Sequence, residues 1–166
     1  MIIRGPFEIK WGANTITDVE SIKVDYSVKT TEYETLDGRT TEIDGAHKVS
    51  ATIMLLASDI PALAAIFPQY FVAQGAAMST GEVVANSAGA IDVVASDCDT
   101  AIVYNNLDIS ACGTPANVVR IVNARTKMET VEIDKVQKVA VKFIGETAQD
   151  EATLQFFKEG TLGGIS

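Results

Sequence analysis

Residues 20–33, ESIKVDYSVKTTEY, and residues 47–56, HKVSATIMLL, decide the predicted fold of this chain. In both segments apolar and polar residues alternate with a period of two, which is typical of β-strands that are half buried. The apolar side chains of the two segments form the predicted core face: Ile22, Val24, Tyr26, Val28, Val49, Ile53 and Leu55. The polar side chains form the opposite face: Lys23, Asp25, Ser27, Lys29, Ser50 and Thr52. We therefore predict one long antiparallel hairpin over residues 20–56.

The tip of this hairpin is polar and long. Residues 30–48 have the sequence TTEYETLDGRTTEIDGAHK, in which Asp37-Gly38 and Asp44-Gly45 mark two bends. We expect residues 34–46 to form a loop of about 12 residues without secondary structure, and loops of this length are often functional or disordered. Its charged residues are candidates for contacts with another molecule: Glu34, Asp37, Arg39, Glu42 and Asp44. A solvated surface loop is the alternative interpretation.

The rest of the chain predicts a mainly β fold, a β-sandwich or partial barrel with one short α-helix. That helix is expected at SDIPALAAIF, residues 58–67, with Ser58 or Asp59 as its cap and Pro61 in its first turn. Short strands are expected at residues 82–84, 91–94 and 102–104, and three more within residues 117–146. We expect one domain over residues 1–166, with an N-terminal strand or arm at 1–12 and a flexible tail at 158–166.

Composition argues against several classes of partner. The chain has 166 residues and a net charge of −9, which disfavours tight binding to nucleic acid or to an anionic membrane. No apolar run approaches the roughly 20 residues of a membrane helix, and the N-terminus lacks the apolar core of a signal peptide, so synthesis in the cytosol is expected. Residues 49–119 contain no Lys or Arg. This span is either a packed half with an acidic rim or a surface that a partner covers.

No pattern in the sequence predicts catalysis, a metal site or a cofactor. His47 is the only imidazole, and no nucleophile motif accompanies it. Asp97 and Asp99 lack the remaining ligands of a calcium loop and are better explained by a capped turn. Cys98 and Cys112 are expected to be reduced thiols, and the alternative is a disulfide between them. We therefore expect a protein that is not an enzyme.

The long strands themselves suggest how the protein works. An exposed strand edge invites pairing with another chain, and closure into a barrel removes every edge. A ring of copies can close a barrel that no single copy can close. In such a ring the polar face would line a water-filled channel. Given the acidity of the chain, we expect the wall of such a channel to be polar with a negative balance.

The order of these parts resembles that of the tail tube (major tail) proteins of tailed bacteriophages, which are related in fold to type VI secretion tube proteins. The resemblance covers nearly the whole chain. It rests on the N-terminal strand, the hairpin at residues 20–56 with its charged tip, the helix SDIPALAAIF and the late strand KVAVKFIGETAQ. The Ala-rich middle at residues 57–116 carries no sequence signature of the family.

The resemblance implies a structural virion protein. Its copies would form homohexameric rings that self-assemble into a stacked tube with a continuous β-barrel inside, through which genomic DNA is ejected into the host without specific binding. Residues 34–46 would then contact the next ring. Sheath, tape measure, and tail terminator or baseplate proteins are the implied partners, and the location is the virion tail, assembled in the host cytoplasm.

Two alternatives stay open: a tube protein of a type VI or other contractile injection system, and a β-sandwich decoration or adhesion protein of a virion. The sequence does not distinguish a contractile from a non-contractile tail, and it does not identify a host.

Overall fold

The computed structural model describes residues 7–56, 59–95, 102–111, 114–147 and 151–158. It is mainly β, with one short α-helix, as predicted. The elements in chain order are β1 (Phe7–Trp11), β2 (Asn14–Ile16), β3 (Val19–Glu34), β4 (Thr40–Leu55), α1 (Ile60–Ile66), a 3-10 turn (Pro68–Tyr70), β5 (Phe71–Val72), β6 (Ala90–Ile91), β7 (Asn105–Ala111), β8 (Thr114–Ile133), β9 (Gln137–Gly145) and β10 (Leu154–Lys158).

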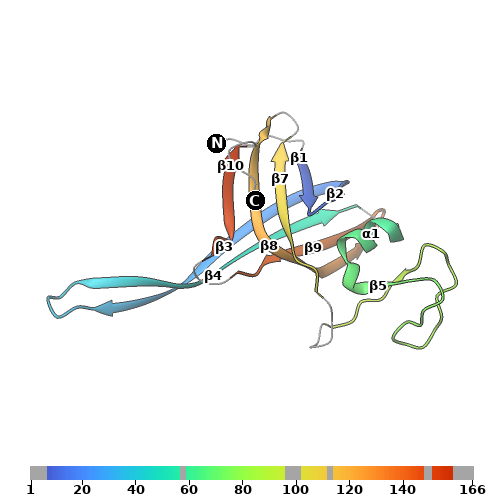
Figure 1. Cartoon of the computed structure of the whole chain (residues 1–166), viewed down its shortest axis with the longest axis horizontal. Helices are drawn as coiled ribbons and strands as arrows, with labels where there is room; N and C mark the ends of the chain where they lie inside the picture. Colours follow the sequence, from blue (N-terminus) through green and yellow to red (C-terminus); the bar gives the residue numbers. More distant parts are fainter. Residues whose placement is uncertain (1–6, 57–58, 96–101, 112–113, 148–150, 159–166) are drawn as a thin grey trace, which may run out of the picture.

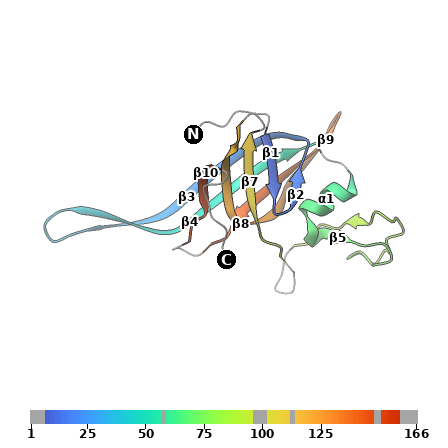
Figure 2. The ribbon, with the colours of Figure 1, turned by 45° about the horizontal axis from the view of Figure 1, so that its top comes forward.

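Eight of the strands form one bent antiparallel sheet that folds over itself into two layers. The strand order is β2-β1-β7-β8-β9-β4-β3, and β10 pairs with β8. The first half of β8 pairs with β7 and β10, and its second half pairs with β9. Strands β1, β7 and β10 therefore form one layer with the start of β8, while β3, β4 and β9 form a crossing layer with its end (Figures 1 and 2). The sheet is not closed in the single chain.

Strand β8 passes from one layer to the other at Asn123. This residue has a φ of 53°, a left-handed conformation that asparagine tolerates better than most residues do. Its side-chain amide donates a hydrogen bond of 2.7 Å to the carbonyl oxygen of Glu146. Its backbone N–H donates one of 3.1 Å to Oδ1 of Asn106. The bend is therefore held by hydrogen bonds to both neighbouring segments.

The hydrophobic core lies between the two layers. Trp11 and Phe143 meet edge to face with ring centroids 6.1 Å apart, and the Trp11 indole donates a hydrogen bond of 3.0 Å to the carbonyl oxygen of Ala124. Helix α1 covers one end of the sandwich, where Leu63 and Ile66 are buried. The helix contains Pro61 in its first turn as predicted. Asp59 precedes it without a side-chain capping hydrogen bond.

The hairpin tip differs from the prediction. Residues 34–46 are not an unstructured loop, because β3 and β4 continue to pair up to Glu34 and Thr40. Only five residues, 35–39, connect the strands. The backbone N–H of Thr35 donates to the carbonyl oxygen of Arg39 at 2.7 Å, and Gly38 has a φ of 83°. The second predicted bend, at Asp44-Gly45, is a β-bulge within β4 and not a turn.

Two strand predictions in the second half were also wrong. Residues 117–146 contain two strands and not three, because β8 is a single strand of 20 residues that bends without ending. Of the short strand expected at 91–94, only Ile91 lies in a strand, β6. In the segment expected at 82–84, Val83 forms an isolated bridge with Ala77. The segment at 102–104 is not a strand. Leu154–Lys158 form the last strand, β10.

Within the described ranges, no helix is both long and apolar enough to span a membrane. Residues 1–6, most of the expected tail (159–166 of 158–166), and Cys98, Cys112, Asp97 and Asp99 lie outside the described residues, whereas Lys158 ends β10.

Candidate functional site

One face of the layer formed by β3, β4, β9 and the end of β8 is polar, and among the described elements no strand or helix is packed along it. In register across the four strands, Lys23 lies beside Thr52, which lies beside Lys142, which lies beside Lys127. The neighbouring row is Asp25, Ser50, Ile144 and Arg125. We call this surface the polar face. It points away from the core, because the alternate residues Val49, Ala51 and Ile53 are fully buried.

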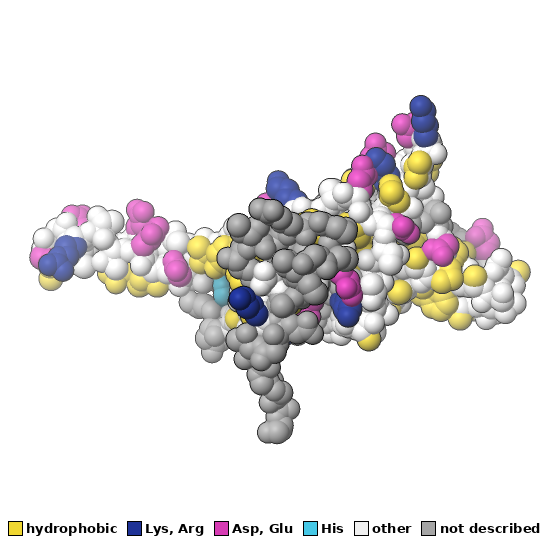
Figure 3. Space-filling view, turned by 90° about the horizontal axis from the view of Figure 1, so that it is seen from above, with side chains coloured by type: hydrophobic (Ala, Val, Ile, Leu, Met, Phe, Trp, Pro, Cys, Tyr) yellow, Lys and Arg dark blue, Asp and Glu magenta, His cyan; other side chains and the backbone are white. Residues whose placement is uncertain are grey.

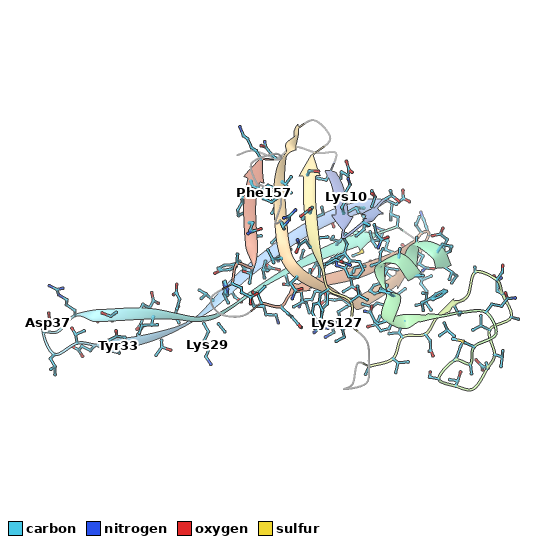
Figure 4. All side chains as sticks on the ribbon, in the orientation of Figure 1. Lys10, Lys29, Tyr33, Asp37, Lys127 and Phe157 are labelled. Carbon is cyan, nitrogen blue, oxygen red and sulfur yellow. The ribbon has the colours of Figure 1, made fainter. Side chains whose placement is uncertain are left out.

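The structure brings together most of the polar residues predicted from the hairpin. Lys23, Asp25, Ser27, Ser50 and Thr52 all lie on the polar face. Lys29 lies beyond them, at the register shift where the hairpin leaves the body (Figure 4). The contribution of β8 and β9 to this face was missed. Strands were expected within residues 117–146, but nothing local in the sequence places one of them beside β4.

The polar face does not have the negative balance that we expected. In the described part of the chain it carries six basic side chains: Lys23, Lys48, Arg125, Lys127, Lys138 and Lys142. Five acidic side chains lie on this face or form ion pairs with those bases: Glu20, Asp25, Glu129, Glu132 and Glu146. The expectation failed because the acidic excess of the chain lies elsewhere, including the hairpin tip. The face is close to neutral.

Strand β3 forms an open edge of the sheet, since it pairs only with β4 within the described residues. Beside this edge the two layers separate and leave an apolar groove of about 820 Å³. We call it the side groove. It is lined by both layers: Phe7, Ile16, Val19, Ile22, Val24, Ile109 and Val119 among others.

The side groove explains why half of the predicted core face is not core in the single chain. Val49, Ile53 and Leu55 are fully buried as expected. On the edge strand, however, Val24 is 37% exposed and Tyr26 is 52% exposed, while Ile22 and Val28 are half-buried. The expectation failed for β3 because the opposite layer does not extend over its outer side.

Beyond the body, residues 30–44 form a two-stranded projection that we call the arm (Figure 1). All five charged residues predicted for contacts lie on it. Glu34 ends β3, Asp37 and Arg39 form an ion pair of 3.4 Å in the turn, and Glu42 and Asp44 lie on β4. The hydroxyl of Thr35 also donates to the Asp37 carboxylate.

His47 lies at the root of the arm and has a structural environment. Its Nε2 donates a hydrogen bond of 2.8 Å to the carbonyl oxygen of Glu151, and its Nδ1 accepts one of 3.3 Å from the Tyr26 hydroxyl. The hydroxyl oxygen of Thr153, a buried residue, lies 3.5 Å from the same Nδ1. The ring therefore joins the hairpin to the segment that leads into β10.

A second polar cluster surrounds Glu146, at the end of β9. The Arg125 guanidinium and the Tyr104 hydroxyl both donate to its carboxylate. Burial alone would raise the pKa of Glu146, but these two hydrogen bonds outweigh burial and hold that pKa below its ordinary value. The hydrogen bond to Glu146 raises the pKa of the Tyr104 phenol, with burial adding to the effect. The cluster stabilises the join between the layers.

Metal ligands are not gathered anywhere in the described ranges, where no group of three or more His, Cys, Asp or Glu side chains could hold an ion. The sites that the structure does present are surfaces for association: a polar sheet face, an open strand edge with an apolar groove, and a projecting arm.

Comparison with protein-family models gives no match, and comparison with curated proteins gives none either. Solved structures do match in fold. A chain of the PVC sheath-tube complex, from an extracellular contractile injection system in the extended state, aligns with a TM-score of 0.57 and 11% identity over 92% of this chain and 88% of that one. The cap that terminates the tube of the anti-feeding prophage aligns with a TM-score of 0.54 and 12% identity over 95% of both chains.

The PVC sheath/tube terminator in the extended state aligns with a TM-score of 0.52 and 13% identity, over 90% of this chain and 91% of that one. These neighbours are structural components of injection systems and not enzymes. At such low identity the likeness concerns the fold alone. The chain therefore shares its fold with components of an extracellular contractile injection system and with the tube-terminating cap of the anti-feeding prophage.

Proposed function

We propose that this chain is a structural tube protein whose copies associate side by side into rings, and that the rings stack into a hollow tube. The observation that carries this proposal is the pairing of an open edge at β3 with an apolar side groove that the described part of the chain does not fill. A neighbouring copy that continues the sheet would account for both features. One of its strands would form hydrogen bonds with the backbone of β3, and its side chains would cover Val24 and Tyr26.

The polar face supports a channel on the inside of such a ring. A sheet that curves into a closed barrel places one face toward the axis, and the face opposite the core is the one that can stay hydrated. Lys23, Asp25, Ser27, Ser50 and Thr52 would then line the channel together with Lys127 and Lys142. The ring size of six and the passage of phage DNA follow from the resemblance to phage tail tubes. A near-neutral wall offers no strong binding to phosphates.

A tube protein or a tube-terminating cap of a contractile injection system is the second candidate, and the structural neighbours favour it. The two roles differ in assembly. A tube protein exposes a stacking surface at both ends of its ring and therefore polymerises, whereas a cap associates with one end and stops. Sheath and terminator proteins are the expected partners in either case.

Sedimentation velocity and negative-stain microscopy of the purified chain, over a wide range of concentration, test the proposal. We expect six-fold rings that stack into tubes as the concentration rises. Single rings that never stack support the cap. A particle that stays monomeric or trimeric at every concentration contradicts the proposal and supports a decoration or adhesion protein.

A further inference from the structure

The side groove is a large apolar surface that the described residues leave uncovered. Its volume is about 820 Å³, and its walls include Ile22 and Val24 from β3 and Ile109 and Val119 from the opposite layer. Phe7 is also part of the wall and is 49% exposed. Apolar side chains that face water are costly, so a segment that covered this groove would stabilise the single chain.

The charged residues of the groove wall are acidic. Among the described lining residues, Glu8, Asp18 and Glu20 are carboxylates and none is a lysine or arginine. Glu8 forms an ion pair of 3.3 Å with Lys10, and Glu20 forms one of 3.1 Å with Lys138. Asp18 forms no ion pair within the described residues. The described basic side chains seen from above are scattered over the arm and the body (Figure 3). A segment that fits the groove therefore combines apolar side chains with a positive charge.

One segment outside the described ranges has this chemistry. Residues 1–6, MIIRGP, contain three large apolar side chains followed by Arg4. Residues 96–101, SDCDTA, and 159–166, EGTLGGIS, contain acidic side chains and no basic ones. The remaining segments are shorter and also lack lysine and arginine: 57–58, 112–113 and 148–150.

Residues 1–6 are attached to the chain at the groove itself. They directly precede Phe7, which is part of the groove wall, and six extended residues reach at most about 20 Å. Gly5-Pro6 is a dipeptide that favours a turn, so the chain can reverse its direction just before β1. A segment tethered this closely has an effective concentration on the order of millimolar at its site. It therefore has an advantage over any separate molecule at an ordinary protein concentration.

We propose that residues 1–6 fold back into the side groove of their own chain, with Ile2 and Ile3 on the apolar wall and Arg4 beside its carboxylates. The segment then covers the surface that the proposed function assigns to a neighbouring copy. The consequence rests on that proposed function. A chain whose groove is filled does not accept its neighbour, so the segment delays ring formation until a neighbouring copy at high concentration displaces it.

The core of the body does not depend on this segment. Val49 and Ile53 on β4 and Val141 on β9 are fully buried between the two described layers. Displacement of residues 1–6 therefore exposes the groove without opening the core. A change in the segment should alter dye binding and assembly while the thermal midpoint of the body stays within a few degrees.

Two double variants of the segment test the inference. Ile2→Asp with Ile3→Asp should free the groove, so that the monomer binds an apolar fluorescent dye at least threefold more strongly. Rings of this variant should form at a concentration at least threefold lower than rings of the unmodified chain. Ile2→Val with Ile3→Val is the matched control and should behave as the unmodified chain.

Each measurement has an outcome that overturns one part of the inference. Unchanged dye binding by the Asp variant overturns the contact with the groove. Rings that form at an unchanged or a higher concentration overturn the delay of assembly. The higher concentration is the result expected if the segment inserts into the groove of a neighbouring copy instead.

Photo-crosslinking of the monomer separates a failure of this inference from a failure of the proposed function. A benzophenone amino acid at position 3 should crosslink to the groove wall at least fivefold more efficiently than the same group at position 161, in the other terminal segment. Mass spectrometry of mixed isotope-labelled and unlabelled chains shows whether both joined peptides belong to one chain. A groove crosslink in a chain that never forms rings keeps the contact and refutes the ring proposal. Crosslinks between different chains only, or equal yields at the two positions, overturn the inference.

Discussion

At the scale of the residue, Glu146 shows how one side chain fixes the join between the two layers. Its carboxylate accepts hydrogen bonds from Arg125 on β8 and from Tyr104, while its backbone carbonyl accepts one from Asn123 at the bend. Asp108 and Arg120 play a similar part within the other layer. They lie opposite each other on β7 and β8 and form a two-pronged ion pair of 2.7 and 3.1 Å, with the guanidinium 4.8 Å from the Phe157 ring centre.

Replacement of Glu146 by Gln should reduce stability at neutral pH and should have no effect in strong acid. The pKa of Glu146 is lowered in the folded chain, so its stabilisation is complete above the ordinary carboxyl pKa and is lost as the pH falls through the lowered value. The carboxylate is partly exposed, and we therefore expect a loss of up to about 1 kcal/mol at pH 7. Urea denaturation at pH 7 and at pH 3 measures it. A deficit that is equal at both pH values would contradict the assignment.

At the scale of the element, β3 differs from β4 although the two strands have matching sequence patterns. β4 is flanked by β3 and β9, and its inward residues are fully buried. β3 is an edge, and of its inward residues Ile22 and Val24 line the side groove. The same alternation therefore forms core on one strand and a surface available to a neighbour on the other.

A pair of cross-strand partners tests this difference. Val24 lies directly opposite Ala51. Ala51→Asp should prevent folding, because burial of an unpaired carboxylate costs several kcal/mol against a typical total stability of about 5–15 kcal/mol. Val24→Asp should fold, since the side chain reaches water, but should not form rings. Ser27→Asp, on the polar face, should fold and should also form rings. Circular dichroism and sedimentation separate the three, and an unfolded Val24→Asp chain would show that Val24 belongs to the core of the monomer.

At the scale of the whole molecule, the body and the arm have separable roles. The body contains the core, the open edge and the polar face, and the arm projects away from them (Figure 1). Under the proposed function the body forms the ring, and the resemblance to phage tail tubes implies that the arm contacts the next ring.

Removal of the arm should separate these roles. Replacement of residues 31–43 by Asn-Gly leaves Thr30 and Asp44 paired across a two-residue turn, which preserves the register of the hairpin. The shortened chain should fold with an unchanged thermal midpoint and form rings that do not stack. Electron microscopy of the shortened and full-length chains at equal concentration is the measurement, and full-length tubes from the shortened chain would show that the arm is a passive extension.

The sequence by itself determined the class of the fold, the long hairpin and the two faces of its strands. These depend on a period of two and on neighbours along the chain, and Val49, Ile53 and Leu55 are buried as that period requires. The helix with Pro61 in its first turn was predictable for the same reason, because the signal is local.

Only the tertiary structure decided which strand is an edge, which strands share the polar face and how far the hairpin continues. Exposure of Val24 and the row from Lys23 to Lys127 depend on pairings between segments about a hundred residues apart, which no local pattern encodes. The charged tip was mistaken for a loop because Asp-Gly pairs and carboxylates favour turns. The continued backbone ladder from Thr30 to Glu34 and the bulge at Gly45 outweigh that preference, and they convert the tip into an arm.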